Sequence, residues 1–254
     1  MKWRLIEQEA YPAAMNMAID HAVYESVVNE REQPTIRFYK WKNSSVSIGA
    51  YQNPKEINLN ACKKHSIGIV RRMTGGRAVF HDKDDFTYSV IAPIRAFNYS
   101  IENAYREICL WIINALNDFG IKATLENKND IVVNGKKISG NAAKAMEKGI
   151  YLQHGTLVYD VDFDVMPQVL NITQDLAKEK IASILELKKI SQNGVYETLK
   201  SNFIKNKDFK TEMPSKYELM RAEELAKAKY STIMLSADTL LKNKGACYVE
   251  RGGS

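Results

Sequence analysis

One stretch of the sequence combines residue types that bind anionic groups. An apolar run at 67–70 leads into two arginines and a short turn, made of Arg71, Arg72, Thr74, Gly75 and Gly76. Glycine lets the backbone bend and approach a ligand closely, and guanidinium and backbone N–H groups donate hydrogen bonds to phosphate or carboxylate oxygens. A second strand-like run follows at 77–81. We therefore predict two strands joined by a cationic, glycine-bearing turn. The residues alone leave two interpretations open, an anion site and an ordinary Gly-Gly hairpin.

A lysine lies on a second predicted hairpin. Asn134 and Gly135 have the pattern of a type I′ turn, between strand-like runs at 130–133 and 136–139. The strand would fix the stem of Lys137, whose ammonium is a compact charge suited to neutralise negative charge at a reacting centre. Lys136 alternates to the opposite face and is expected in solvent. The alternative is that Lys137 is a surface lysine as well.

Three motifs follow one another along the chain. They are Arg71-Arg72-x-Thr-Gly-Gly-x-Ala-Val-x-His81-Asp82, then Asn129-Asp130-Ile131 with Gly135-Lys136-Lys137-Ile138-Ser139-Gly140-Asn141-Ala142, and then His154-Gly155-Thr156-Leu157. In this order and at this spacing they resemble the lipoate-protein ligase A family, with its biotin/lipoate ligase catalytic domain, and its octanoyltransferase relatives. The stretches Asn16–Asp20 and Ile36–Tyr39 resemble the family too, so the resemblance runs from residue 3 to residue 200.

The resemblance implies roles for individual residues. Lys137 would be catalytic and would bridge the acyl carboxylate and the α-phosphate of ATP. The residues implied in ATP binding are Arg72, Thr74, Gly75, Gly76, Ala78, Val79, Phe80, His81, Asp130 and Lys137. Those implied in lipoate binding are Arg72, Gly76, His81, Lys137, Gly140, Ala142 and His154. Asp130 would hold Mg²⁺ or orient Lys137, and a purely structural role stays open for Asp130, His81 and His154.

The implied activity is that of an ATP-dependent lipoate-protein ligase. Lipoate or octanoate would react with ATP and Mg²⁺ to give an acyl-AMP. The acyl group would then pass to a lysine of a lipoyl domain or of glycine-cleavage H protein. The first alternative is an octanoyltransferase that takes its acyl group from acyl carrier protein through a cysteine thiolate. The second is a non-catalytic scaffold that binds lipoate or nucleotide.

The choice between ligase and transferase depends on two features. Residues 115–135 contain no cysteine, and Cys109 stands too early in the chain to supply the transferase nucleophile. Arg77 points the other way, because Gly-Gly-Arg also occurs in the octanoyltransferase branch of the resemblance. We favour the ligase on the missing thiol.

Periodicity and turn signals predict the elements that must position these residues. Apolar residues at helical spacing predict helices at 13–29 and 101–119, and we expect a short helix at 54–64. Further strand-like runs occupy 36–41, 46–51, 86–91 and 150–159. We expect a small-residue connection at 141–147 and a helical tail at 163–170, 174–187, 194–205 and 215–229. The fold class is therefore α+β. The resemblance implies mixed and antiparallel β-sheets flanked by helices, of the biotin/lipoate ligase type.

The chain is expected to hold one catalytic domain. Residues 1–214 would form it, and residues 215–254 would be a helical extension with a mobile tail, with no full accessory domain. Many members of the family carry such a domain for adenylation. The resemblance therefore implies that a separate accessory subunit is a possible partner.

Composition excludes several classes of protein. At 254 residues and 45% hydrophobic, the chain can bury a sizeable core. The net charge of 36 − 30 = +6 suits an anionic substrate or an acidic protein domain, but we find no nucleic-acid motif and no basic stripe. No apolar run reaches the roughly 18 residues of a membrane helix, and no signal peptide begins the chain. The cysteines Cys62, Cys109 and Cys247 are odd in number and lack metal-site spacing, so the expected location is the cytoplasm.

Overall fold

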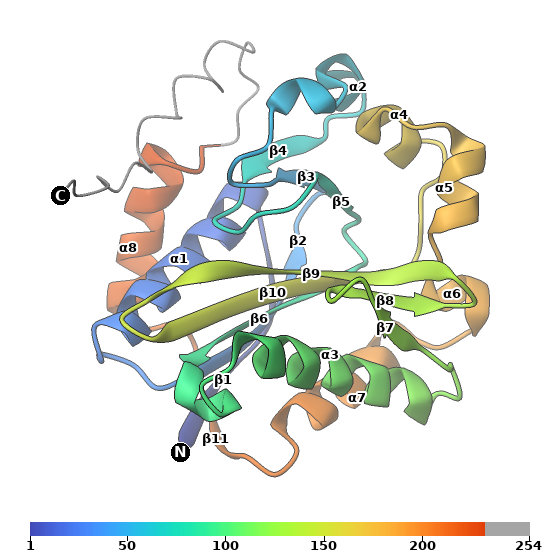
Figure 1. Cartoon of the computed structure of the whole chain (residues 1–254). Helices are drawn as coiled ribbons and strands as arrows, with labels where there is room; N and C mark the ends of the chain where they lie inside the picture. The colour runs from blue at the N-terminus through green and yellow to red at the C-terminus, as the bar shows by residue number, and fades with distance from the viewer. Residues whose placement is uncertain (232–254) are drawn as a thin grey trace, which may run out of the picture.

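Two β-sheets organise the chain, one of eight strands and one of three (Figure 1). The structure is a computed structural model and describes residues 1–231. The large sheet has the order β11-β1-β2-β6-β10-β9-β8-β7. Strand β1 pairs in parallel with β2 and β11, and every other neighbouring pair in this sheet is antiparallel. The predicted α+β class, with mixed and antiparallel sheets, is confirmed.

The strands of the large sheet are β1 (Lys2–Tyr11), β2 (Thr35–Trp41), β6 (Phe86–Pro93), β7 (Thr124–Glu126), β8 (Asp130–Val133), β9 (Lys136–Glu147), β10 (Ile150–Leu157) and β11 (Asp208–Thr211). Helices cover both of its faces. α1 (Ala13–Val28) and α8 (Lys216–Ala228) lie together on one face, where Ile19, Val23 and Leu152 share an apolar cluster. α3 (Ile101–Asp118) and α7 (Gln192–Ile204) lie on the other face, over a cluster that includes Ile112 and Phe203. The predicted long helices at 13–29 and 101–119 are confirmed.

The small sheet differs from the hairpin predicted for the arginine-glycine stretch. Its order is β4 (Gly68–Arg71), β3 (Ser45–Ile48) and β5 (Val79–His81), with β3 parallel to β4 and antiparallel to β5. The connection from β4 to β5 therefore crosses β3, and the two predicted arms never pair. The prediction was wrong because β3, a strand distant in sequence, takes the place between them. β3 also ends at Ile48, before the predicted end at residue 51.

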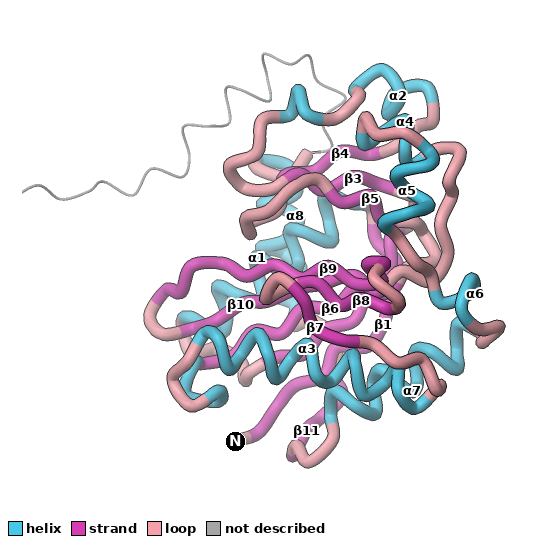
Figure 2. The backbone as a smooth tube through the Cα atoms, turned by 45° about the vertical axis from the view of Figure 1, so that its right-hand side comes forward, coloured by secondary structure: helices cyan, strands magenta, loops and turns pink. Residues whose placement is uncertain are grey.

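Short helices lie beside the small sheet, on the far side of the large sheet from α3 and α7 (Figure 2). They are η1 (Pro54–Glu56), α2 (Leu59–Lys64), α4 (Met166–Leu170) and α5 (Gln174–Lys180). Val46, Ile48, Cys62 and Val169 form the apolar cluster under this part of the molecule. A further 3-10 helix, η2 (Ile94–Phe97), follows β6.

The hairpin that carries Lys137 is confirmed, with a longer second arm than predicted. Asn134 and Gly135 both have positive φ, 52° and 75°, as a type I′ turn requires. β9 then runs on to Glu147, so the expected connection at 141–147 is a strand. Small residues have little strand preference of their own, and the continuous pairing of β9 with β10 overrides it.

The C-terminal part is helical as predicted, with two differences. The expected helix at 174–187 is divided into α5 and α6 (Ile184–Leu187), because Ile181 forms a bridge with Lys137 and the Ala182 N–H donates to the Lys137 carbonyl at 2.9 Å. β11 was not predicted, since its exposed residues have no apolar pattern. The expected mobile tail from residue 232 lies outside the described residues. Among residues 1–231, none of the helices combines the length and apolar composition needed to span a bilayer.

Candidate functional site

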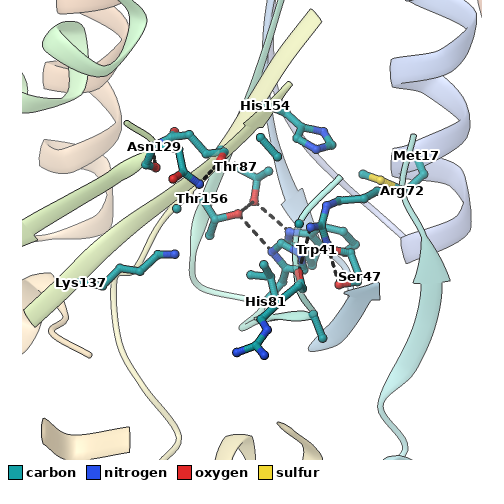
Figure 3. Close-up of a pocket in the computed structure, with 18 of the residues that line it drawn as sticks. Met17, Trp41, Ser47, Arg72, His81, Thr87, Asn129, Lys137, His154 and Thr156 are labelled. Carbon is teal, nitrogen blue, oxygen red and sulfur yellow. Dashed lines mark hydrogen bonds between the residues drawn. The ribbon is translucent and has the colours of Figure 1, made fainter. Parts of the chain in front are cut away.

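A cavity of about 130 Å³ lies where the small sheet faces the large sheet (Figure 3). Strands β2, β6, β9 and β10 contribute from the large sheet, β3 and β5 from the small sheet, and α1 contributes one methionine. The lining residues are Met17, Tyr39, Trp41, Ser47, Arg72, Gly76, Arg77, Ala78, Val79, His81, Thr87, Asn129, Lys137, Gly140, Asn141, Ala142, His154, Gly155 and Thr156. The wall thus offers apolar and aromatic surface together with cations and hydrogen-bonding groups, which suits a ligand with an apolar chain and a polar end.

Arg72 is buried at the edge of this cavity. Its Nε donates to Thr74 Oγ1 at 3.1 Å, and its Nη1 donates to the carbonyl and the hydroxyl of Ser47 at 2.9 and 3.2 Å. Its Nη2 donates to the carbonyls of Gly75 and Arg77 at 2.6 and 2.8 Å. Burial lowers the pKa of Arg72 to about 10, so it stays charged at neutral pH. The guanidinium therefore holds the turn at 74–77 against β3.

Arg71 binds a different set of backbone carbonyls from Arg72 and has a structural role. Its Nη1 donates to the carbonyls of Gly49, Ala50 and Gln52 at 2.7, 3.2 and 2.9 Å. A side chain at Gly49 would meet the Gly76 carbonyl oxygen at 1.9 Å. The segment after β3 can therefore contact the turn at 74–77 only because residue 49 is glycine.

His81 is stacked and hydrogen-bonded on both sides. Its ring lies 4.1 Å from the ring of Trp41, with 16° between the planes. Its Nε2 lies 2.8 Å from Ser47 Oγ, and its Nδ1 lies 3.1 Å from Thr156 Oγ1. Burial, reinforced by the positive charge of Arg72, holds the pKa of His81 well below its usual value. His81 is therefore a neutral imidazole at physiological pH.

His154 joins the turn to a buried acid. Its Nε2 lies 2.6 Å from Thr74 Oγ1, and its Nδ1 lies 3.7 Å from Asp20 Oδ2. Asp20 also accepts hydrogen bonds from Arg37 Nη1 at 2.7 Å and from the hydroxyls of Tyr39 and Ser89 at 3.1 and 2.9 Å. Burial alone would raise the pKa of Asp20, but Arg37 and His154 lower it below its usual value. Asp20 is therefore a carboxylate that anchors this side of the cavity.

Lys137 lies across the cavity from Arg72 and His154 (Figure 3). Its Nζ is 2.6 Å from Asp130 Oδ1, and its side chain is 43% exposed. A Cβ on Gly140 would lie 2.8 Å from Lys137 Cε and 2.9 Å from Nζ. The lysine therefore lies over the backbone of Gly140, and its ammonium, paired with Asp130, forms part of the cavity wall. Lys136 points the other way and pairs with Glu186 at 3.2 Å.

Two asparagines fix the wall beside Lys137. Asn129 Nδ2 donates to the Asn141 carbonyl, and Asn141 Nδ2 donates to the Asn129 carbonyl, both at 3.0 Å. Asn141 Oδ1 accepts from the Tyr88 hydroxyl at 2.6 Å. A Cβ on Gly155 would lie 2.1 Å from that oxygen, so only glycine fits beside it.

Most of the predicted ligand-binding residues line this one cavity, namely Arg72, Gly76, Ala78, Val79, His81, Lys137, Gly140, Ala142 and His154. Four predicted residues do not line it. Thr74 and Gly75 bind Arg72, Phe80 packs on the apolar cluster of the small sheet, and Asp130 pairs with Lys137. Among residues 1–231, no group of three or more His, Cys, Asp or Glu side chains could hold a metal ion, so Asp130 would be a single carboxylate for Mg²⁺. The binding roles of all these residues stay predictions.

The sequence interpretation missed ten lining residues. Asn129, Asn141, Gly155 and Thr156 stand inside the motifs and had that signal. Met17, Tyr39, Trp41, Ser47, Arg77 and Thr87 were not assigned to the site. Trp41 and Thr87 come from neighbouring strands, and the Trp41 Nε1 donates to Thr87 Oγ1 at 2.9 Å. Such residues meet only through the pairing of β2 with β6, which no local pattern reveals.

Neither of the cysteines in the described part of the chain lines the cavity. Cys62 is buried under the small sheet, and burial raises the pKa of its thiol to about 11. Cys109 accepts from Gln153 Nε2 at 3.8 Å, and burial raises its pKa to about 12. Because Gln153 alternates with His154 along β10, Cys109 lies on the opposite face of the sheet from the cavity. Cys247 lies outside the described residues.

Comparison with known proteins identifies the family. Residues 12–204 match the lipoyl protein ligase A/B catalytic domain, and the chain belongs to this family. The octanoyltransferase LipM of Halalkalibacterium halodurans is 35% identical, with 91% of this chain and 96% of the relative covered. The octanoyltransferase LipM of Brevibacillus brevis is 32% identical, with 91% and 97% covered.

Solved structures agree with this family. A lipoate-protein ligase A bound with ATP superposes with a TM-score of 0.80 and 30% identity, over 92% of this chain and 97% of the other. A bi-partite lipoate protein ligase from Thermoplasma acidophilum gives a TM-score of 0.80 and 30% identity, over 91% and 94%. The chain is therefore an enzyme of a family that includes ligases and transferases, and the predicted membership of the lipoate-protein ligase family is confirmed.

The curated relatives contradict the favoured activity. The ATP-dependent ligase was preferred because no cysteine stands at 115–135, yet relatives that match nine-tenths of this chain are octanoyltransferases. They support the first alternative instead. A thiol at 115–135 is therefore no marker of the transferase in this chain, whereas Arg77, which agrees with the octanoyltransferase pattern, lines the cavity.

Proposed function

We propose that this enzyme is a protein octanoyltransferase. It takes an octanoyl group from the thioester of acyl carrier protein and passes it to a lysine of a lipoyl domain or of glycine-cleavage H protein. The observation that carries the proposal is the identity of 32–35% with octanoyltransferases along nine-tenths of the chain. The catalytic domain is proposed to span residues 1–214, with α8 as a C-terminal extension.

The cavity offers the parts that acyl transfer needs. Gly76, Gly140, Ala142 and His154, which were predicted to bind the acyl group, would lie along the octanoyl chain. The neutral amine of the acceptor lysine attacks the thioester carbonyl. A C–N bond forms, the C–S bond breaks, and the carrier thiolate takes up the proton that the amine loses. Lys137 would stabilise the negative charge that develops on the carbonyl oxygen, because its ammonium reaches the cavity on a half-exposed side chain.

The thiols in the described part of the chain favour direct attack of the acceptor lysine on the thioester, without a covalent acyl-enzyme. A covalent acyl-enzyme needs a thiolate beside the substrate. Cys62 and Cys109 are buried away from the cavity with raised pKa values, so neither meets that requirement. The corresponding test is a cysteine variant, Cys247→Ser, together with a search for a thioester on the chain after incubation with labelled octanoyl carrier protein.

The expected co-substrates change with the reaction. Exchange of a thioester for an amide needs neither ATP nor Mg²⁺. It therefore does not require an accessory subunit for adenylation. A structural relative was solved bound with ATP, so ATP with Mg²⁺ is a necessary control addition. The net charge of +6 suits acidic protein partners, both as carrier and as acceptor.

The deciding experiment supplies the purified chain with octanoyl carrier protein and an unmodified lipoyl domain and follows the acceptor by intact mass. We expect octanoyl-modified lipoyl domain without ATP. Lys137→Ala should abolish it, and Lys136→Ala, on the same strand but facing Glu186, should retain it. Modification only with free octanoate or lipoate plus ATP would refute the transferase. Tight ligand binding without either product would support the non-catalytic scaffold.

A further inference from the structure

The bonds of Arg72 extend into two similar branches. A guanidinium has five N–H donors and no acceptor, and those of Arg72 are all directed at the protein. Three of the acceptors are backbone carbonyls, and the other two are the hydroxyls of Ser47 and Thr74. Each hydroxyl has one histidine as its other partner, Ser47 with His81 and Thr74 with His154.

Arg72 fixes the direction of the first hydrogen bond in each branch and leaves the proton of each hydroxyl for its second partner. Because Arg72 can only donate, each hydroxyl accepts from it and has its own proton to give to the histidine Nε2. When each hydroxyl gives its proton to the neighbouring ring, both Nε2 atoms are acceptors and Nδ1 carries the N–H of each ring. The Nδ1 of His81 faces Thr156 Oγ1 at 3.1 Å, and that of His154 faces Asp20 Oδ2 at 3.7 Å. Asp20 Oδ2 is a carboxylate acceptor, and Thr156 Oγ1 can accept from His81 while it donates to Thr87 Oγ1 at 3.3 Å.

We propose that Arg72 is a positioning residue that, through Ser47 and Thr74, sets the tautomer of both cavity histidines and holds the turn at 75–77 closed over the site. This assignment differs from a direct contact with a substrate phosphate or carboxylate. Arg72 is 5% exposed, and contact with a ligand would require breaking bonds to the turn itself. Only the kinetic part of the test depends on the proposed transferase function.

The glycines of the turn agree with a positioning role. Gly76 has φ of +96°, a region that side chains disfavour, and a Cβ there would lie 2.8 Å from Arg72 Nη2. The carbonyls on either side of it, those of Gly75 and Arg77, point inward to the same guanidinium nitrogen. Glycine at this position lets the backbone close around Arg72.

The test uses single deletions with matched controls. Ser47→Ala removes the hydroxyl that lies between Arg72 and His81. Thr74→Val removes the hydroxyl that lies between Arg72 and His154. Thr74→Ser keeps the second hydroxyl and serves as its rescue. Ser45→Ala removes a buried hydroxyl of the same strand that donates only to the Asn43 carbonyl at 2.8 Å. The readouts are the ring nitrogen NMR signals of ¹⁵N-histidine-labelled protein, amide hydrogen exchange of residues 74–78, and octanoyl transfer.

The expected result is selective. Wild type should show both cavity histidines as Nδ1–H tautomers. Ser47→Ala should change the ring signals of His81 and not those of His154, and Thr74→Val should do the reverse. Either deletion should speed amide exchange in the turn and lower kcat/KM for transfer about 10-fold, the value of one hydrogen bond to a charged group. Thr74→Ser and Ser45→Ala should stay close to wild type.

The opposite results would overturn the proposal. An Nε2–H tautomer at either histidine in wild type contradicts the assigned directions. Unchanged ring signals and exchange in both deletions would show that Arg72 does not act through the hydroxyls. If one of the two variants, Ser47→Ala or Thr74→Val, fails to fold, the other variant still tests the branch whose hydroxyl it removes. Absence of octanoyl transfer in wild type would refute the proposed function, and the NMR and exchange results, which use no substrate, would still decide this one.

Discussion

Replacing Gly140 with alanine should separate the position of Lys137 from the stability of the fold. The added Cβ would lie 2.8 Å from Lys137 Cε, where ordinary contacts begin at 3.4 Å, so the side chain must move by 3.4 − 2.8 = 0.6 Å or more. The lysine is 43% exposed, so its side chain has room to move outward at the cost of its 2.6 Å contact with Asp130. Gly140 is paired with Asp130 and Thr156 and has no positive φ, so alanine should leave stability unchanged or raise it by about 0.4–1 kcal/mol.

The catalytic loss should be large by comparison. A displacement of about 1 Å in a catalytic group reduces the rate about 100-fold, which corresponds to about 2.7 kcal/mol of transition-state stabilisation. The assay is octanoyl transfer to a lipoyl domain, with kcat and KM determined separately beside urea unfolding. We expect kcat to fall and KM for the octanoyl donor to change little. A Gly140→Ala enzyme within 3-fold of wild type, while Lys137→Ala is inactive, would refute the argument that the lysine must lie over Gly140.

Three further predictions concern stability. Burial holds the pKa of His81 below the unfolded value of about 6.5, so its stabilising contribution is present above that pH and is lost as pH falls, by up to about 1.4 kcal/mol per unit. Urea unfolding at pH 7 and 5.5 should therefore show wild type losing about 1–2 kcal/mol more than His81→Gln, and equal losses would contradict the buried neutral histidine. Glu218→Gln should lower the free energy of unfolding by about 3 kcal/mol, because Arg4 then loses its buried bidentate carboxylate at 2.7 and 2.8 Å. The measurement is urea unfolding, and an unchanged midpoint of the urea transition would show that the ion pair is dispensable. Gly155→Ala should cost about 1–3 kcal/mol by forcing Asn141 out of place, with thermal unfolding as the measurement and wild-type stability as the contrary result.

Local sequence patterns were enough to predict the elements whose conformation depends on residues close together in the chain. The helix at 101–119 has a clear apolar face and a Ser100 cap that accepts from the Asn103 N–H. Asn134 and Gly135 favour a type I′ turn by their own conformational preferences, and that turn places Lys137 on a strand with Lys136 on the opposite face, as predicted. Each of these features depends on residues within one turn or one helix, so sequence spacing carries the information.

The parts that could not be predicted depend on distant pairings. β3 separates β4 from β5, and this pairing brings the Ser47 hydroxyl to Arg72 and His81. The pairing of β6 with β10 brings Thr87 within 3.3 Å of Thr156. Small, common residues of this kind have no pattern of their own, and only the closed sheet shows that they belong to the site.

The two cations that the sequence singled out have different physical situations. Arg72 is 5% exposed and gives all its donors to the protein, so its charge is fixed in place before any substrate arrives. Lys137 is 43% exposed, and Asp130 is its one close carboxylate among residues 1–231. A group that stabilises developing charge must gain interactions in the transition state that it lacks in the ground state. Lys137 can do so by shifting from Asp130 toward the reacting oxygen. Arg72 would first have to break its hydrogen bonds to the turn at 75–77. We therefore assign the chemistry to Lys137 and the architecture of the cavity to Arg72.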